Sequence, residues 1–159
     1  MNPQIDQMFS SAEGRYLEPV EQAALIDFAS SLDLRLAAMR ELQEKESALV
    51  AACVDEMLAS DPGLHERHVE VREKAIRDMT LVLRCCATAM VRDSDTYLQQ
   101  RLLPWFRSIL TAFEMQQAAQ AAYTSLHERC GQELDPSHFA LISPFLESTV
   151  RELTKPPTQ

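Results

Sequence analysis

Apolar residues recur at intervals of three and four along most of the chain, the spacing that places side chains on one face of an α-helix. The pattern is clearest from residue 69 to residue 92, where Arg72 is the only break in the apolar stripe. No segment shows the sustained alternation of apolar and polar residues that indicates a β-strand. The sequence therefore predicts an all-α fold. The stripe contains Val69, Ile76, Met79, Leu83, Cys86 and Met90.

Prolines, glycines and capping residues divide the rest of the chain into further helices. A short helix is expected from Pro3 to about Ala12, and Pro19 begins a second helical region that reaches Met39. About eight helices of these lengths are typical of a globin-like fold around a central pocket. The other helices are predicted from about Lys45 to Asp61, from Ser94 or Asp95 to Leu102, from Pro104 to Phe113, from Gln116 to Cys130 before Gly131, and from Asp135 or Pro136 to Leu153.

A second stripe of small or apolar side chains runs beside the first one, and Asp78 is the only acid in it. Burying an unpaired carboxylate is costly, so Asp78 must be solvated, paired or in contact with hydrogen-bond donors. One interpretation is an ion pair with Lys74 at the helix edge. The other is a ligand pocket, in which Asp78 accepts hydrogen bonds from ring N–H groups and Arg77 pairs with a ligand carboxylate. The stripe contains Ala75, Asp78, Val82, Cys85 and Ala89.

Length and charge narrow the class of protein. A chain of 159 residues is expected to form one domain, with residues 154–159 as a tail. The net charge is −9, and residues 1–60 contribute −7 of it, from eleven acids and four bases. This balance disfavours nucleic acid, whose phosphates require a basic surface. No apolar run reaches the ~18 residues of a membrane span, and no secretory signal is recognised, so a cytoplasmic location is expected.

Catalytic and metal-binding motifs are missing from the sequence. It has no glycine-rich phosphate loop, no Gly-x-Ser-x-Gly and no His-Glu-x-x-His, so enzyme activity is not expected. His65 and His68 are interpreted as solvated side chains, so no metal site is predicted, and residues 103–113 offer no proximal histidine for haem. The four cysteines form no Cys-x-x-Cys pair and are expected to be reduced structural thiols. They are Cys53, Cys85, Cys86 and Cys130.

Two segments resemble the phycobiliproteins, the allophycocyanins and phycocyanins of cyanobacterial antennae. Residues 75–84 contain Ala-Ile-Arg-Asp and then Leu-Arg, where the family has Cys-Leu-Arg-Asp followed by Leu-Arg. Residues 12–19 read Ala-Glu-Gly-Arg-Tyr-Leu-Glu-Pro, which is similar to the family's Ala-Glu-Ala-Arg-Tyr-Leu-Ser-Pro. The regions of Asp93, Leu102 and Phe145 also follow the family pattern. The resemblance therefore spans nearly the whole chain.

The resemblance implies a globin-like helical domain preceded by an N-terminal two-helix arm, residues 1–20. In phycobiliproteins this arm packs against a partner subunit. The apolar side chains near the N-terminus supply the surface that such an arm needs. The candidate interface residues are Met8, Phe9, Arg15, Tyr16 and Leu17.

The resemblance also identifies candidate ligand residues and one loss. Arg77 and Asp78 correspond to family residues that face the propionates and pyrrole nitrogens of a linear tetrapyrrole, and Arg84 joins them as a candidate. The family's pigment-carrying cysteine is replaced by Ala75, whose methyl group cannot form the thioether. The segment after Pro62 is also several residues shorter than the family's pigment-walling loop. No covalent bilin is expected.

Two functions follow from these expectations. The first is a non-enzymatic phycobilisome-related accessory protein, which acts through protein–protein contacts in assembly, remodelling or degradation of the antenna or a photosystem. Its partner would be a second copy, a phycobiliprotein or a photosystem subunit, in the cytoplasm or at the cytoplasmic face of thylakoid membranes. The second is a carrier or sensor that binds a bilin or another tetrapyrrole non-covalently through Arg77 and Asp78.

Overall fold

The computed structural model describes residues 2–153 and 155, and these residues form helices without any strand. None of the helices is both long and apolar enough to cross a membrane within these residues. The predicted tail, residues 154–159, lies outside the described residues except for Lys155. The helices are α1 (Pro3–Ser11), α2 (Pro19–Ser30), α3 (Leu32–Ser60), α4 (Leu64–Arg67), α5 (Val71–Arg92), the π-helix η1 (Leu98–Leu102), α6 (Leu103–Ala112), α7 (Gln116–Glu133) and α8 (Pro136–Leu153).

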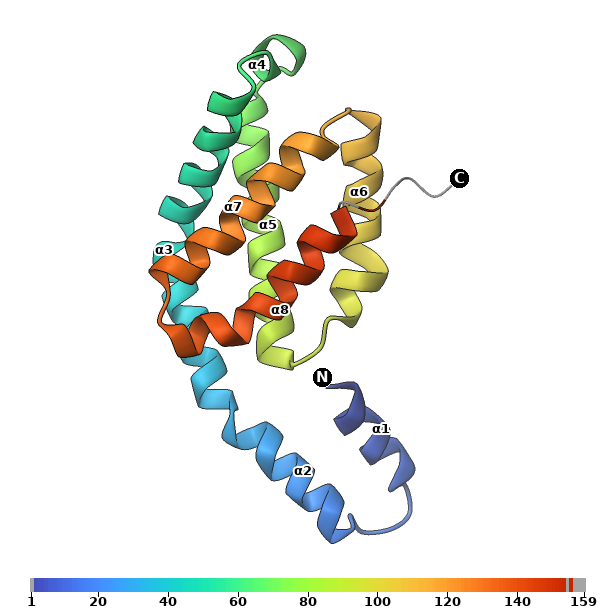
Figure 1. The fold of residues 1–159 in the computed structure, drawn as a ribbon. Coiled ribbons are helices and arrows are strands. Elements are labelled where there is room, and N and C mark those ends of the chain that lie inside the picture. Colours follow the sequence, from blue (N-terminus) through green and yellow to red (C-terminus); the bar gives the residue numbers. More distant parts are fainter. Residues whose placement is uncertain (1, 154, 156–159) are drawn as a thin grey trace.

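The body of the molecule consists of α3 and α5–α8, which cross one another around a single core (Figure 1). Helix α3 packs against α5, α7 and α8, and α8 also packs against α5, α6 and α7. Large side chains from four helices meet in the core, among them Leu49, Leu83, Leu126 and Ile142. The predicted all-α, globin-like fold is confirmed. So is the burial of most of the predicted stripe, namely Met79, Leu83, Cys86 and Met90.

Helices α1 and α2 form a hairpin that projects from one end of the body (Figure 1). Arg15 stabilises the turn between them, because its guanidinium donates hydrogen bonds of 2.8 and 2.7 Å to the carboxylate of Glu21. This contact, together with the backbone N–H of Glu18, lowers the pKa of Glu21 to about 2. None of the residues of α2 is buried. The arm therefore extends to Ser30, beyond the predicted boundary at residue 20.

Helix α3 corrects the predicted break before Lys45. The helix is continuous from Leu32 to Ser60, and the chain bends at Ser31 instead. Neither glycine nor proline occurs in this segment, and a stripe of core residues continues through it. The stripe includes Ala38, Leu42, Leu49, Cys53 and Met57.

The start of the central helix also differs from the prediction. Val69, which the sequence pattern places in the buried stripe, is 78% exposed and precedes α5. The helix begins after Glu70, which has a φ of 54° and so interrupts the helical backbone. The spacing of Val69 fits the helical stripe, but α5 begins two residues later, so Val69 is not part of the helix.

Pro104 lies in the first turn of α6, close to the predicted helix start, whereas Gly131 does not end a helix as predicted. The backbone stays helical from η1 into α6, because the wider π turn, in which the N–H of Leu103 donates to the carbonyl of Leu98, accommodates the proline that lacks an N–H. Helix α7 continues past Gly131 to Glu133. A Cβ at Gly131 would lie 3.2 Å from the ring of Phe139, so the glycine permits the close approach of α8.

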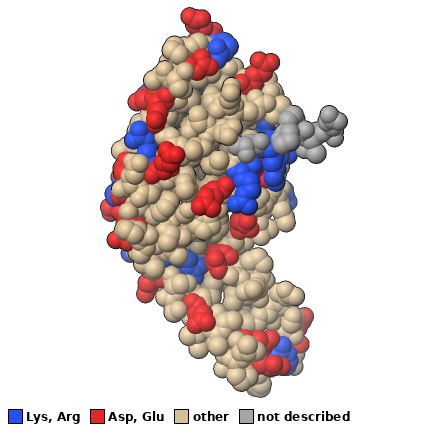
Figure 2. Space-filling model, viewed as in Figure 1, with Lys and Arg blue, Asp and Glu red and all other residues tan. Residues whose placement is uncertain are grey.

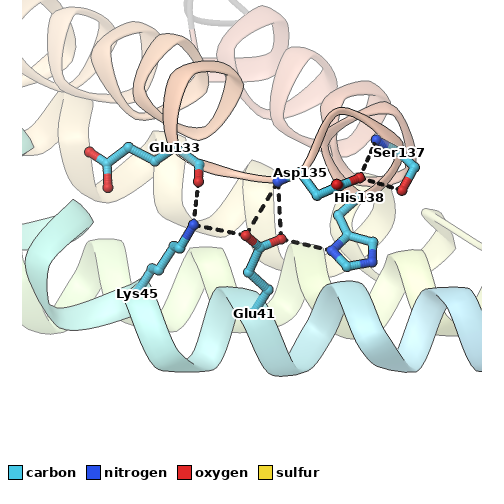
Figure 3. Close-up of polar contacts among 6 residues, drawn as sticks. All are labelled: Glu41, Lys45, Glu133, Asp135, Ser137 and His138. Carbon is cyan, nitrogen blue, oxygen red and sulfur yellow. Dashed lines mark hydrogen bonds and ion pairs between the residues drawn. The ribbon is translucent and has the colours of Figure 1, made fainter.

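Glu41 of α3 links this helix to the turn between α7 and α8 (Figure 3). Its carboxylate accepts a 2.8 Å hydrogen bond from the ammonium of Lys45 and lies 2.7 Å from Nδ1 of His138. It also accepts the backbone N–H of Asp135 at 3.2 Å. Lys45 donates to the carbonyl of Glu133 as well. These contacts lower the pKa of Glu41, and the hydrogen bond from Lys45 has the largest effect. They also fix the start of α8.

Candidate functional site

A cleft of about 1230 Å³ opens at the end of the body opposite the arm. Its walls come from the C-terminal ends of α3 and α6, the N-terminal ends of α5 and α7, and α4. The ring of His68 lies edge-on to that of Phe113, with 6.4 Å between their centroids, so two segments of the rim touch. Apolar side chains form the inner walls and charged ones lie at the rim. The apolar residues include Met57, Leu64, Met79, Phe106 and Leu110.

Three of the residues that the sequence singled out line this cleft. Ala75, Arg77 and Asp78 lie on the first turns of α5 and face it together with Lys74. Arg84, further along α5, instead faces α3. Its guanidinium donates hydrogen bonds of 2.8 and 2.6 Å to the carboxylate of Glu46 on that helix. Arg84 is not among the residues that line this cleft.

The predicted ion pair between Asp78 and Lys74 is absent. Oδ1 of Asp78 instead accepts a 3.0 Å hydrogen bond from Nε of Arg77, and the ammonium of Lys74 donates to the carbonyl of Val69. The side chain of Asp78 is 34% exposed and that of Arg77 is 72% exposed. Solvent therefore reaches this pair, and both side chains are free to turn toward a molecule in the cleft.

Cysteine chemistry is remote from the cleft. None of the described residues that line it is a cysteine. Burial raises the pKa of the Cys86 and Cys130 thiols to about 12, and it also raises that of Cys85. The raised pKa keeps these thiols protonated at neutral pH, and a protonated thiol is a poor nucleophile.

The described residues contain no group of three or more histidine, cysteine or acidic side chains that could hold a metal ion. His65 is exposed, and His68 lies at the rim of the cleft.

Tyr123 of α7 is a site residue that the sequence did not single out. It lines the cleft, is 4% exposed, and packs the edge of its ring against Phe106 at 6.1 Å between centroids. Its hydroxyl group is buried and has no hydrogen-bond partner among the described residues. Burial, with smaller contributions from Cys86 and Asp78, raises its pKa well above the ordinary value. No sequence pattern marks this residue, because a tyrosine on an apolar helix face commonly packs in the core without any further role.

The arm presents most of its predicted interface residues to solvent. Phe9 is 47% exposed and Tyr16 is 97% exposed, whereas Met8 and Leu17 are half-buried within the arm. Arg15 is exposed but already paired with Glu21 in the same chain. This pair joins the turn after α1 to the first turn of α2.

The apolar surface of the arm is larger than predicted, because it continues along α2 and onto α3. Uncharged residues cover most of the projecting arm in the view of Figure 2. The additional exposed apolar residues, with their exposed fractions, are Val20 (71%), Ile26 (65%), Leu32 (37%) and Leu34 (43%).

Two polar contacts join the arm to the C-terminal end of α5. The side-chain amide of Asn2 donates to the carboxylate of Asp93 at 2.5 Å. Arg35, which is 3% exposed, donates to the carbonyl of Val91 at 2.5 Å and to that of Phe28 at 2.6 Å. The arm is thus held at both of its ends.

One comparison identifies the family of this chain. The sequence model of the phycobilisome protein family matches residues 9–153, which is nearly the whole chain. The chain belongs to this family. No curated protein matches the sequence.

Membership of the phycobilisome protein family indicates a phycobilisome-related role. Members normally bind bilins, assemble into oligomers with other phycobilisome subunits, and are generally light-harvesting proteins rather than enzymes.

Proposed function

We propose that this protein is a non-enzymatic accessory subunit of the phycobilisome that carries no covalent bilin and docks its arm onto another chain of the same fold. One observation carries the proposal. Helix α2 has no buried residue, and two of its large apolar side chains, Val20 and Ile26, are 71% and 65% exposed. A helix with no fully buried residue in its own chain gains further packing energy from a partner.

The charge of the arm favours a specific contact over non-specific self-association. Residues 1–31 carry five acids and one arginine, which gives a net charge of −4. Two of these charges, on Arg15 and Glu21, neutralise each other within the turn. The remaining acids disfavour unspecific self-association of the apolar surface, because they repel one another. A second copy is the simplest partner with the required fold.

The test is the mass of the purified protein in solution, measured by light scattering across a dilution series. Wild type is expected to be at least a dimer. Val20→Glu and Ile26→Glu each place a charge in the apolar contact, and each should weaken association by about 2–4 kcal/mol, roughly 30- to 1000-fold in dissociation constant. Both residues are exposed, so the variants should remain folded.

Val69→Glu is the matched control, because Val69 is 78% exposed but lines the cleft, away from the arm. It should associate like wild type. A monomeric wild type would exclude the homodimer, and purified allophycocyanin would then be tested as the partner. If wild type binds neither a second copy nor allophycocyanin, or if the two arm variants associate like wild type, the proposal is wrong.

A second function is favoured by the cleft, namely non-covalent binding of a linear tetrapyrrole as a carrier or sensor. Its volume exceeds the ~300–1,000 Å³ typical of small-molecule sites. Lys74 and Arg77 at the rim can pair with propionate groups, and Asp78 can accept pyrrole N–H hydrogen bonds. The residues present therefore fit such a ligand without the thioether.

Titration of biliverdin into wild type and Asp78→Ala tests this second function. Asp78 is part of an exposed pair, so its removal should change stability by less than about 1 kcal/mol. Biliverdin affinity should fall about tenfold or more if Asp78 accepts two charge-assisted hydrogen bonds. Asp55→Ala is the control, because Asp55 also pairs with an arginine, Arg72, but lies outside the cleft. Equal affinity in all three proteins would refute a role for Asp78.

A further inference from the structure

The hydroxyl group of Tyr123 is the one buried side-chain N or O atom in the described part of the chain that has no hydrogen-bond partner. Folded proteins rarely leave such a group unpaired, because it has lost its hydrogen bonds to water and gained none in return. The ring itself is well packed, edge-on against Phe106 at an interplanar angle of 82°. The position of the hydroxyl is therefore fixed by α6 and α7, and the missing element is an acceptor.

The unpaired hydroxyl belongs to a residue of the cleft wall. Tyr123 lines the cleft from α7, and Asp78 lines it from α5. Asp78 raises the pKa of Tyr123 through its charge but forms no hydrogen bond with its hydroxyl. The phenol is thus neutral, and an acceptor that enters the cleft would meet a donor that is already oriented.

The surroundings define what kind of acceptor is suitable. Phe106, Leu110, Ala119 and Ala122 are buried apolar neighbours in the same wall, so an ionic group next to the hydroxyl would lose its hydration without a counterion. A neutral carbonyl oxygen loses much less hydration free energy when it is buried. Anionic groups belong at the rim, where Lys74 and Arg77 are exposed.

We propose that the hydroxyl of Tyr123 donates a hydrogen bond to a neutral carbonyl oxygen of the apolar, carboxylate-bearing molecule that binds in the cleft, and so selects for ligands with such an oxygen at their inner end. A linear tetrapyrrole meets this description, with lactam carbonyls on its terminal rings and propionates along its length. The inference rests on the second function above and specifies which part of the ligand lies deepest.

The test uses Tyr123→Phe, which removes the hydroxyl alone, and Tyr97→Phe, the same change at a tyrosine that is 53% exposed and outside the cleft. Biliverdin is titrated into wild type and both variants, and thermal unfolding of each ligand-free protein is followed by circular dichroism. The dissociation constant should rise roughly three- to tenfold in Tyr123→Phe and stay unchanged in Tyr97→Phe. Ligand-free Tyr123→Phe should be at least as stable as wild type, because it loses no hydrogen bond.

The possible failures are distinguishable. If Tyr123→Phe binds biliverdin as tightly as wild type, the donor role is wrong while the proposal for the cleft stands. If ligand-free Tyr123→Phe unfolds at a clearly lower temperature than wild type, the hydroxyl already has a partner, such as a buried water, and the inference is overturned. If wild type does not bind biliverdin at all, the second function fails, and this inference fails with it.

Discussion

Replacing Arg35 by alanine tests how the arm is joined to the body. Arg35 is 3% exposed, and its guanidinium donates to the carbonyls of Val91 at 2.5 Å, Phe28 at 2.6 Å and Ser31 at 3.4 Å. These carbonyls lie at the C-terminal ends of α2 and α5, where helix carbonyls lack partners and a cation is favourable. The guanidinium also lies 4.4 Å from the centroid of the Phe28 ring.

The expected loss of stability follows from these contacts. A hydrogen bond with a charged partner contributes about 1.5–3 kcal/mol, and a partly buried cation–π contact contributes about 1 kcal/mol. The 3.4 Å bond is long enough to neglect. Two short bonds and the ring contact sum to about 4 kcal/mol at the low end, but alanine lets water reach the freed carbonyls and removes a buried cation. The net loss should therefore be about 2–3 kcal/mol.

Urea unfolding followed by circular dichroism measures this loss directly. A change of this size should also lower the melting temperature by about 4–12 °C for a chain of this length. Arg40→Ala is the matched control, since Arg40 is an exposed arginine on the same helix, and it should cost less than about 0.5 kcal/mol. Arg35→Lys should fall between wild type and Arg35→Ala, because an ammonium cannot reproduce the forked geometry.

A loss below about 1 kcal/mol for Arg35→Ala would refute this reasoning, because it would mean that the buried guanidinium contributes no more than a surface side chain. A loss in Arg40→Ala equal to that in Arg35→Ala would have the same consequence. It would show that the measured effect comes from the helix position and not from the three carbonyls.

Two further predictions concern the bilin and the pH. Wild type co-expressed with bilin-synthesis enzymes and a broad-specificity lyase should show no added bilin mass by intact-protein mass spectrometry. Ala75→Cys should gain one bilin if the shortened segment after Pro62 leaves room for it. A bilin attached to wild type would contradict the first prediction. Glu41 has a lowered pKa in the folded state, so its contacts stabilise the protein above the carboxyl's usual value of 4.5 and are lost as the pH falls through the lower folded value. The difference in unfolding free energy between wild type and Glu41→Gln should therefore be present at neutral pH and shrink below about pH 4; a constant difference would argue against the carboxylate.

The sequence predicted the elements whose pattern depends only on local spacing. Met79, Leu83, Cys86 and Met90 are buried as expected, because a three-four stripe on one helix faces one core whatever its neighbours are. Helix ends were less predictable. Gly131 is a place where α8 approaches closely, and a π turn carries the backbone through Pro104, so residues that commonly stop helices serve tertiary packing here.

The site was only partly predictable, for a similar reason. The motif placed Arg77 and Asp78 on the cleft, since both lie on the first turns of one helix. It could not exclude Arg84, whose partner Glu46 is 38 residues away in the sequence. Arg35 and Tyr123 become notable only when their surroundings are known. One is a buried cation held by carbonyls, and the other is a buried hydroxyl without an acceptor.

The two proposed functions concern opposite ends of α5 and can therefore coexist. The cleft lies at the N-terminal end of this helix, around Asp78, and the arm is joined to its C-terminal end at Val91 and Asp93. Asp78 and Val91 are separated by about 20 Å at 1.5 Å per helical residue. A partner on the arm thus leaves the cleft open. Val20→Glu should weaken association without affecting biliverdin binding, and Asp78→Ala should do the reverse, so each proposal stands or falls by its own measurement.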